Sequence, residues 1–368
     1  MGKCFVTKLN GSVNNSALLK IGETKFKISK EASQLSFYIQ VIKPMVLTIE
    51  GNGYFTNNEY NENKGTTLSV SENTNQRCFL KVNGDVSISI PDKYNLLSLY
   101  AVDSHIVFDI DSLKYSKSLN SLHLERATTC GDIASLKELT AIRDLCLGSN
   151  QLIGDIDNLK NLTSMTFFSA PSTKISGDIA VFSNLRKLTD LNIESTQVVG
   201  DIASLKDLTS MKNLSIGSNQ LSGDIASLKN LTSMTFFSAS RTKISGDITN
   251  LRNSKITECY LNELTLSGDL ATIPSTCNFI SLLNNNNSNF TWSSRASSSK
   301  ILAMIGNPKI DNVDKMLQDQ AQCVKGYNES DSSMFKTISA TGPRTSASDA
   351  AIATLQQKGY TVAITLAS

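Results

Sequence analysis

The stretch GDIASLKELTAIRDLCLGSNQLI at residues 131–153 decides the fold, because it returns 69 residues later as GDIASLKDLTSMKNLSIGSNQLS at 200–222. Gly-Asp pairs begin at positions 131, 154, 177, 200, 223, 246 and 268, so successive pairs are 23, 23, 23, 23, 23 and 22 residues apart. Phe108-Asp109-Ile110 and Gly84-Asp85-Val86 extend the series toward the N-terminus. Self-similarity at a fixed period of this length indicates a solenoid, in which each repeat packs against its neighbours.

Alignment on the glycine, taken as offset 0, gives apolar columns at offsets 2, 5, 8, 11, 14, 16 and 21. Offsets 14 and 16 are two residues apart, which predicts a strand with alternate side chains turned inward. The steps of three before them predict a helical turn or a polyproline-like segment on the opposite wall. The aspartate at offset 1 is a candidate N-cap for that segment. Short polar residues at offset 19 are candidates for capping the turn after the strand: Asn150, Thr173, Thr196, Asn219 and Thr242.

IRDLCLGSNQL (142–152) and MKNLSIGSNQL (211–221) resemble the leucine-rich-repeat signature LxxLxLxxNxL. The GDI that follows is similar to the LxGxIP extension of plant-type repeats, with the proline missing. The resemblance implies an α/β-type repeat solenoid with a parallel sheet on its concave face. It implies no particular ligand.

The sequence on either side of the repeats predicts two further parts. Residues 1–83 contain β-branched and alternating runs, and they predict a small N-terminal all-β domain, sandwich-like, that covers the exposed first edge of the solenoid. The solenoid itself is assigned to residues 84–275. After Pro274 the period blurs, so residues 276–368 predict degenerate repeats and an atypical α/β C-terminal cap.

Composition excludes several classes of partner. With 35 basic and 33 acidic residues, the charge gives no argument for nucleic acid. No window approaches the roughly 18 apolar residues of a membrane span. Residues 1–20 lack the apolar core of a secretory signal, so we expect synthesis in the cytoplasm without a signal peptide. Seven cysteines without framework spacing then predict reduced thiols.

His123 and Cys146 share the outward column at offset 15, with Glu125 and Asp144 facing the same way. A thiol beside an imidazole and a carboxylate is the composition of a nucleophile or of part of a metal site. The column continues, however, as ordinary serine and asparagine, and nothing supplies an oxyanion hole. The offset-1 aspartates could form a calcium ladder, but capping explains one aspartate per repeat without a metal. We therefore expect a protein that is not an enzyme and that uses no cofactor or metal.

The concave face is the expected binding surface, because Phe167 and Phe236 occupy the same outward offset in duplicated repeats. Exposed aromatic side chains favour contact with a partner, although these two could also pack on a loop or an adjoining subunit. The expected partner is a protein or a cell-surface glycan, and a homo-oligomer is a further option. The predicted site also includes Ser169, Asp190, Asn192, Glu194, Asn213, Ser215, Ser238 and Arg241.

The phrases IEGNGYFTNN (49–58), VNGDVSISIPDKYNLLSL (82–99) and SDAAIATLQQKGYTV (348–362) resemble repeat proteins carried by phages of gut Bacteroidales, the crAss-like group among them. This resemblance implies a virion component, such as a head or tail fibre or a decoration protein. Its N-terminal domain would attach to other virion proteins, and its repeats would be displayed to a host or partner. The alternatives are a cytosolic protein-protein interaction scaffold and, as a third class, a thiol enzyme at His123 and Cys146.

Overall fold

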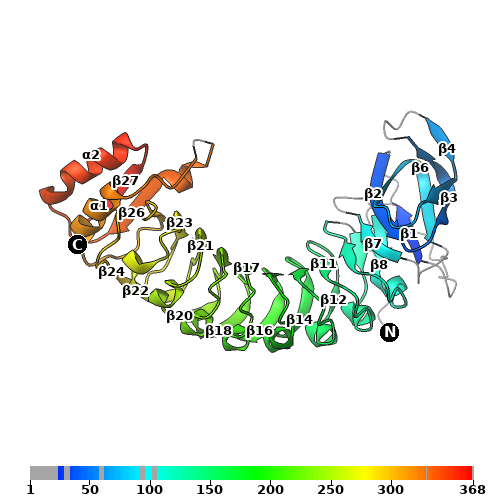
Figure 1. The fold of residues 1–368 in the computed structure, drawn as a ribbon, viewed down its shortest axis with the longest axis horizontal. Coiled ribbons are helices and arrows are strands. Elements are labelled where there is room, and N and C mark those ends of the chain that lie inside the picture. Colours follow the sequence, from blue (N-terminus) through cyan, green and yellow to red (C-terminus); the bar gives the residue numbers. More distant parts are fainter. Residues whose placement is uncertain are drawn as a thin grey trace. The chain divides into compact units, whose positions relative to one another are not determined.

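The computed structural model describes residues 24–28, 34–57, 62–90, 96–101, 106–126, 128–328 and 330–366 of the 368-residue chain (Figure 1). The chain divides into two compact units, a first unit of residues 1–177 and a second unit of residues 178–368. The first contains an antiparallel sheet and the earliest repeats. The second contains the later repeats and the α-helices α1 (Val313–Gln322) and α2 (Asp349–Gln357).

The antiparallel sheet of the first unit is built around one long strand, β6 (Gln76–Ile90). One edge of β6 pairs with β3, and its other edge is shared by β2 along the first half and β1 along the second half. The all-β character predicted for the N-terminal part is therefore confirmed as an antiparallel sheet, which belongs to the same unit as the first repeats. Because residues 84–86 lie within β6, the sequence Gly-Asp-Val there belongs to this antiparallel sheet. The partner strands are β1 (Thr24–Ile28), β2 (Gln34–Val41), β3 (Met45–Thr56), β4 (Asn63–Gly65) and β5 (Thr67–Val70).

Each of the two short strands beside β6 starts a parallel ladder. Strand β2 pairs with β7, which continues in parallel to β9, β11 and β13; this is the main ladder. Strand β1 pairs with β8, which continues to β10 and begins a second ladder. The antiparallel sheet thus covers the first edge of both ladders. The sequence analysis predicted such a cover for a single edge. These strands are β7 (Leu96–Tyr100), β8 (Ile106–Asp109), β9 (Ser121–His123), β10 (Thr128–Cys130), β11 (Asp144–Cys146), β12 (Ile153–Asp155), β13 (Phe167–Ser169) and β14 (Lys174–Asp178).

Two parallel ladders also build the second unit. Its main ladder runs from β15 through β17, β19, β21, β23 and β25 to β26 and β27, all in parallel. Its second ladder joins β16, β18, β20, β22 and β24. The strands are β15 (Asp190–Asn192), β16 (Gln197–Asp201), β17 (Asn213–Ser215), β18 (Gln220–Asp224), β19 (Phe236–Ser238), β20 (Lys243–Asp247), β21 (Glu258–Tyr260), β22 (Thr265–Asp269), β23 (Phe279–Ser281), β24 (Asn289–Thr291), β25 (Ala303–Ile305), β26 (Thr337–Thr341) and β27 (Thr361–Thr365).

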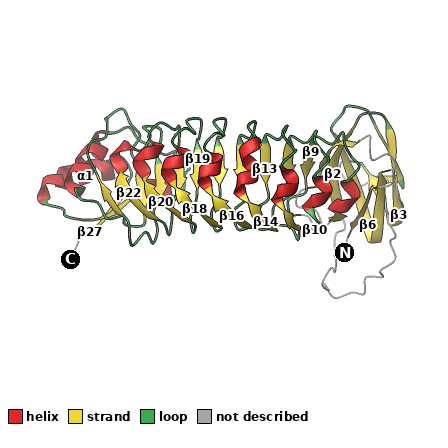
Figure 2. Ribbon diagram, turned by 90° about the horizontal axis from the view of Figure 1, so that it is seen from below, coloured by secondary structure: helices red, strands yellow, loops and turns green. Residues whose placement is uncertain are grey.

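Short 3-10 helices form the wall opposite the main ladder (Figure 2). A 3-10 helix has three residues per turn, so offsets 2 and 5 lie on one face; Ile202 and Leu205 are accordingly fully buried. The predicted N-cap is confirmed: the Asp201 carboxylate accepts the Ala203 N–H at 2.8 Å. The helices are η2 (Ile110–Leu113), η3 (Ile133–Leu136), η4 (Ile156–Leu159), η5 (Ile179–Asn184), η6 (Ile202–Leu205), η7 (Ile225–Leu228), η8 (Ile248–Leu251) and η9 (Leu270–Thr272).

The Gly-Asp pair acts between repeats as well as within one. Gly223 has φ +123°, and a Cβ atom at this position would collide with the capping carboxylate of Asp201 in the preceding repeat. Glycine supplies both the backbone conformation and the space. The pair therefore recurs in seven successive repeats for two different reasons, one for each residue.

The two buried asparagines at offset 19, Asn150 and Asn219, fasten their repeat to the one before it. Asn219 donates through Nδ2 to the carbonyls of Ile193 at 2.8 Å and Ile216 at 3.2 Å, and its Oδ1 accepts the Thr196 N–H at 2.9 Å. Asn150 makes the equivalent three bonds in the first unit. The predicted capping role is confirmed, and it extends across the repeat boundary.

The C-terminal part of the second unit departs from the repeat pattern, as expected for a cap. Helix α1 begins after Asn312, whose side chain accepts the Lys315 N–H. Ahead of it, buried Arg295 donates to five backbone carbonyls, those of residues 271, 273, 274, 277 and 300, and so holds the last turns together. The elements η10 (Ser333–Lys336) and η11 (Ser346–Ser348) precede β26 and α2. Among the described residues, no helix is long and apolar enough to span a membrane.

The buried amide predicts a large stability effect for one side chain. Replacing Asn219 by alanine leaves the Ile216 carbonyl and the Thr196 N–H buried without partners, whereas the Ile193 carbonyl keeps the Thr196 hydroxyl as a donor. The free energy of unfolding should therefore fall by roughly 2–4 kcal/mol. Asn230 is exposed in the same repeat pair, and Asn230→Ala should change it by less than about 0.5 kcal/mol. Denaturant unfolding of the two variants compares them directly, and equal losses would contradict the assigned role.

Candidate binding surface

The structure places the ten predicted site residues on the outward side of the main ladder, but in separate units. Phe167 and Ser169 belong to β13 of the first unit. The other eight lie on β15, β17 and β19 or directly after them, in the second unit. The proposed alignment of Phe167 with Phe236 crosses from one unit to the other and stays a prediction.

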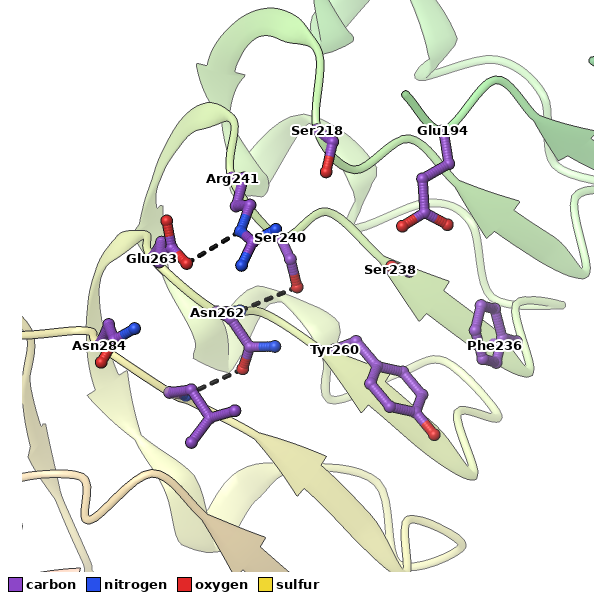
Figure 3. A pocket seen from close by; sticks show the side chains of 11 residues that line it. Glu194, Ser218, Phe236, Ser238, Ser240, Arg241, Tyr260, Asn262, Glu263 and Asn284 are labelled. Carbon is purple, nitrogen blue, oxygen red and sulfur yellow. Dashed lines mark hydrogen bonds and ion pairs between the residues drawn. The ribbon is translucent and has the colours of Figure 1, made fainter. Parts of the chain in front are cut away.

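A shallow hollow of about 440 Å³ lies on this face of the second unit (Figure 3). Four predicted residues line it, namely Glu194, Phe236, Ser238 and Arg241. Asp190, Asn192, Asn213 and Ser215 are on the neighbouring strands, outside its lining. The sequence analysis missed the remaining residues of the lining, which are Ser218, Ser240, Tyr260, Asn262, Glu263, Leu283 and Asn284.

Tyr260 was missed because one repeat is a residue shorter than the others. Counted from Gly246, Tyr260 stands at offset 14, an inward column. The ladder register instead pairs it with Ser238 of the outward column. When one residue is deleted between two strands, a count that ignores the deletion assigns every following side chain to the opposite face of the sheet. The 22-residue spacing between Gly246 and Gly268, visible in the sequence, is the signal of this shift.

Phe236 stands at the open end of an aromatic row. Its ring centroid lies 5.6 Å from that of Tyr260, which lies 5.4 Å from Phe279, and Phe279 lies 4.6 Å from Phe335 of η10. Phe236 and Tyr260 are half-buried, whereas Phe279 is fully buried. The expectation that Phe236 points freely to solvent is therefore corrected, since its ring is partly covered. Such tilted pairs hold aromatic rings in fixed positions.

Hydrogen bonds fix the polar side of the hollow. Arg241 donates to Glu263 at 2.9 Å across its rim, and this ion pair raises the pKa of the arginine. Below it, the Ser240 hydroxyl accepts the backbone N–H of Asn262, and the side-chain Oδ1 of Asn262 accepts the Leu283 N–H at 2.8 Å. Figure 3 shows these three contacts as dashed lines and the Glu194 carboxylate directed toward the hollow.

Three further carboxylates on this face receive hydrogen bonds from neutral groups. Asp190 accepts from the Asn213 amide, Glu194 from the Ser215 hydroxyl at 3.2 Å, and Glu258 from the Tyr260 hydroxyl at 3.3 Å. Burial and the charge of Glu258 raise the pKa of Tyr260, which keeps its proton available for that bond. Among the described residues of this surface, Arg241 with Glu263 is the ion pair that is formed. Asp190, Glu194 and Glu258 thus form no ion pair among the described residues.

Solved structures with the same architecture decide how this chain is classified. An internalin, inlF from Listeria monocytogenes, matches with TM-score 0.52 at 18% identity, over 74% of this chain and 82% of its own. The protein has the leucine-rich-repeat fold. A TDR receptor matches with TM-score 0.53 at 18% identity, over 70% of this chain and 44% of its own. No family model and no curated protein matches the sequence.

A further leucine-rich-repeat match is the Arabidopsis receptor kinase HAESA, in complex with the peptide hormone IDA and the co-receptor SERK1. Its TM-score is 0.50 at 22% identity, over 63% of this chain and 40% of the receptor chain. The present chain thus spans less than half the length of the two receptor chains. At these identities the likeness shows the fold, and leucine-rich repeats are typically non-catalytic scaffolds that bind proteins or peptides.

The His123 and Cys146 pair, in the first unit of this leucine-rich-repeat chain, differs from the exposed pair that was expected. Cys146 is buried, and its thiol donates to Glu125 at 3.7 Å. Burial and the charge of Glu125 raise the pKa of this thiol to about 11, so almost none of it is a thiolate nucleophile at neutral pH. His123 is half-buried and stacks on Tyr100 with ring centroids 4.4 Å apart; Phe167 lies 6.2 Å away on its other side.

Within the described ranges, no group of three or more His, Cys, Asp or Glu side chains could hold a metal ion. The offset-1 aspartates direct a carboxylate oxygen to the N–H two residues ahead, which is the geometry of a cap. Cys130 is disulfide-bonded, so the expectation of seven reduced thiols is wrong at this position. Five other cysteines are free and buried: Cys78, Cys146, Cys259, Cys277 and Cys323.

The stacked histidine predicts a pH effect on stability. Burial is the main cause that lowers the pKa of His123 below its ordinary value, so the folded protein favours the neutral ring. Stability should be full above the unfolded-state pKa, about 6.5, and should decrease as the pH falls from there toward the lower folded-state pKa. Melting temperatures measured between about pH 7 and about pH 5 should show this loss, and His123→Gln should reduce it. An identical pH slope in both proteins would refute the assignment.

Proposed function

We propose that the chain is a non-catalytic binding module that takes an extended segment of a partner protein on the main ladder of its second unit. The hollow in Figure 3 is the observation that supports this most directly. Phe236 and Tyr260 present partly open aromatic rings beside polar groups that are already hydrogen-bonded. Aromatic anchors next to satisfied polar groups are the composition of energetically important interface sites.

Rigidity of the surface supports a binding role. The outward side chains stand on strands whose backbone groups pair with neighbouring strands, and the Ser240, Asn262 and Leu283 contacts fix the loops behind them. A surface that is ordered before binding loses little conformational entropy when a ligand arrives. HAESA, which has the same fold, is described in complex with a peptide hormone, and this supports a peptide as the ligand class.

The charge on this face favours a basic segment. Asp190, Glu194 and Glu258 hold hydrogen bonds from neutral donors only, and so retain their negative charge for a partner. A lysine or arginine side chain could pair with Glu194 while its stem lies against the ring of Phe236 or Tyr260. A protein segment with basic and apolar residues therefore fits this surface better than an uncharged glycan does.

Selection from a random displayed-peptide library tests this function. We expect enrichment of basic peptides with apolar residues. The double variant Phe236→Ala, Tyr260→Ala should bind them about 10- to 100-fold more weakly, because interface anchors typically contribute more than about 1 kcal/mol each. Lys206 and Lys229 are exposed on the opposite wall, so the variant Lys206→Ala, Lys229→Ala is the matched control and should bind like wild type.

Other outcomes of that selection would move or replace the proposal. Peptides that bind the double variant and the wild type equally would place the site elsewhere, and Phe167→Ala then tests the first unit. A glycan array probed with the same variants separates the two ligand classes. Uncharged glycans that depend on Phe236 and Tyr260, in the absence of peptide binding, would contradict a peptide ligand.

We further propose that the protein is part of a phage particle, with its N-terminal all-β domain attached to other virion proteins. The sequence resemblance to repeat proteins of Bacteroidales phages supports this location. Mass spectrometry of purified particles should detect peptides from both units in fixed proportion to the major structural proteins. Their presence in the infected-cell lysate but not in particles would favour the cytosolic scaffold.

A further inference from the structure

The main ladder of the second unit ends in an open strand edge. Strand β27 pairs in parallel with β26 along its whole length, from Thr361 opposite Thr337 to Thr365 opposite Thr341. In the part of the chain that the structure describes, no strand pairs with its other edge. An open edge presents a row of backbone N–H and C=O groups and is a template for pairing with another chain.

This edge lacks the features that usually prevent such pairing. The sequence of β27, Thr-Val-Ala-Ile-Thr, contains no charge and no proline, and its pairing with β26 has no bulge. Leu366, which follows directly, is 65% exposed. Edge strands in soluble proteins are commonly protected by lysine, proline or a bulge. The strand is therefore free to accept a partner strand.

The backbone groups that face outward can be identified. The Thr365 carbonyl accepts the Gly342 N–H at 3.1 Å, so the backbone groups of Thr365 face β26. Backbone direction alternates along a strand, so Thr361 and Ala363 face β26 as well. Val362 and Ile364 consequently direct their N–H and C=O groups toward the open edge. In an antiparallel partner, such residues form the hydrogen-bonded pairs.

The sequence of β27, Thr-Val-Ala-Ile-Thr, is symmetric in residue type about Ala363, with a β-branched aliphatic residue and then a threonine on each side. When two copies are antiparallel and centred on Ala363, Thr361 meets Thr365, Val362 meets Ile364, and Ala363 meets itself. This register is also the one in which Val362 and Ile364, the residues with outward backbone groups, are opposite each other. We propose that β27 pairs with β27 of a second copy of this chain around a two-fold axis at Ala363.

Side-chain burial agrees with this arrangement. Val362 and Ile364 are half-buried and stand in register with fully buried Ile338 and Ala340 of β26. Helix α2 buries a single side chain, that of Leu355, so it covers this part of the sheet only in part. A two-fold axis normal to the sheet keeps each face on its own side, so the second copy extends the apolar layer next to Val362 and Ile364. Five residues give a small interface, and the dimer is therefore weak and concentration-dependent.

Charge substitution at the two ends of β27 tests both the dimer and its register. Thr361 and Thr365 are exposed, so replacing them leaves the fold intact. The variant Thr361→Lys, Thr365→Lys places like charges opposite each other at both ends and should raise the dimer dissociation constant at least about tenfold. The matched variant Thr361→Lys, Thr365→Glu places opposite charges there, and it should remain dimeric and weaken as salt is added.

Sedimentation equilibrium of the full chain over a wide concentration range is the measurement, with melting temperatures as the check on folding. Wild type should shift from monomer to dimer as its concentration rises. A wild type that stays monomeric throughout would overturn the proposal, and so would a folded Lys/Lys variant that dimerises like wild type. A folded Lys/Glu variant that is monomeric would overturn the register. Failure of the peptide-binding experiment leaves this result unaffected, because β27 contributes no residue to the hollow.

Discussion

A buried backbone carbonyl needs a hydrogen-bond donor, and the residues that supply this donor hold neighbouring repeats together. In the loop after a main-ladder strand, the side chain at offset 19 supplies such a donor: Thr173, Thr196 and Thr242 each donate to the carbonyl three residues earlier. Asn219 satisfies one carbonyl of its own repeat and one of the repeat before it. Each repeat is therefore complete only beside its neighbour, which is why repeats of this kind are stable as arrays and not singly.

This dependence separates the residues that build the fold from those that are free to act. Inward columns and capping side chains are committed to the neighbouring repeats. Outward positions on the main ladder have no such duty, so they vary from serine to phenylalanine without disturbing the stack. In the second unit that freedom produced an aromatic row beside three carboxylates with neutral hydrogen-bond donors. The surface thus has a chemical character of its own on a uniform framework.

The sequence predicted what is periodic and missed what is local. The columns, the Asp201 type of cap, the Asn219 type of clamp and the covering β domain all follow from period, residue type and edge chemistry. The second ladder was missed because its strands contain the Gly-Asp pair, and glycine carries no strand signal. Burial of His123 was missed because its neighbour Tyr100 lies on β7, in a segment without the repeat motif. Tyr260 was missed because the 23-residue count was continued through a repeat that is one residue shorter.

One strand of the N-terminal sheet closes two ladders at once. Because β6 pairs with both β1 and β2, one after the other along the same edge, and each of these pairs with the first strand of its own ladder, the loss of β6 would affect both ladders together. The N-terminal sheet thus protects the first edges of both ladders of the first unit, and its unfolding would expose the two edges at the same time. A protease cut within this sheet would therefore expose two unpaired strand edges, and each of them could pair with a strand of another chain.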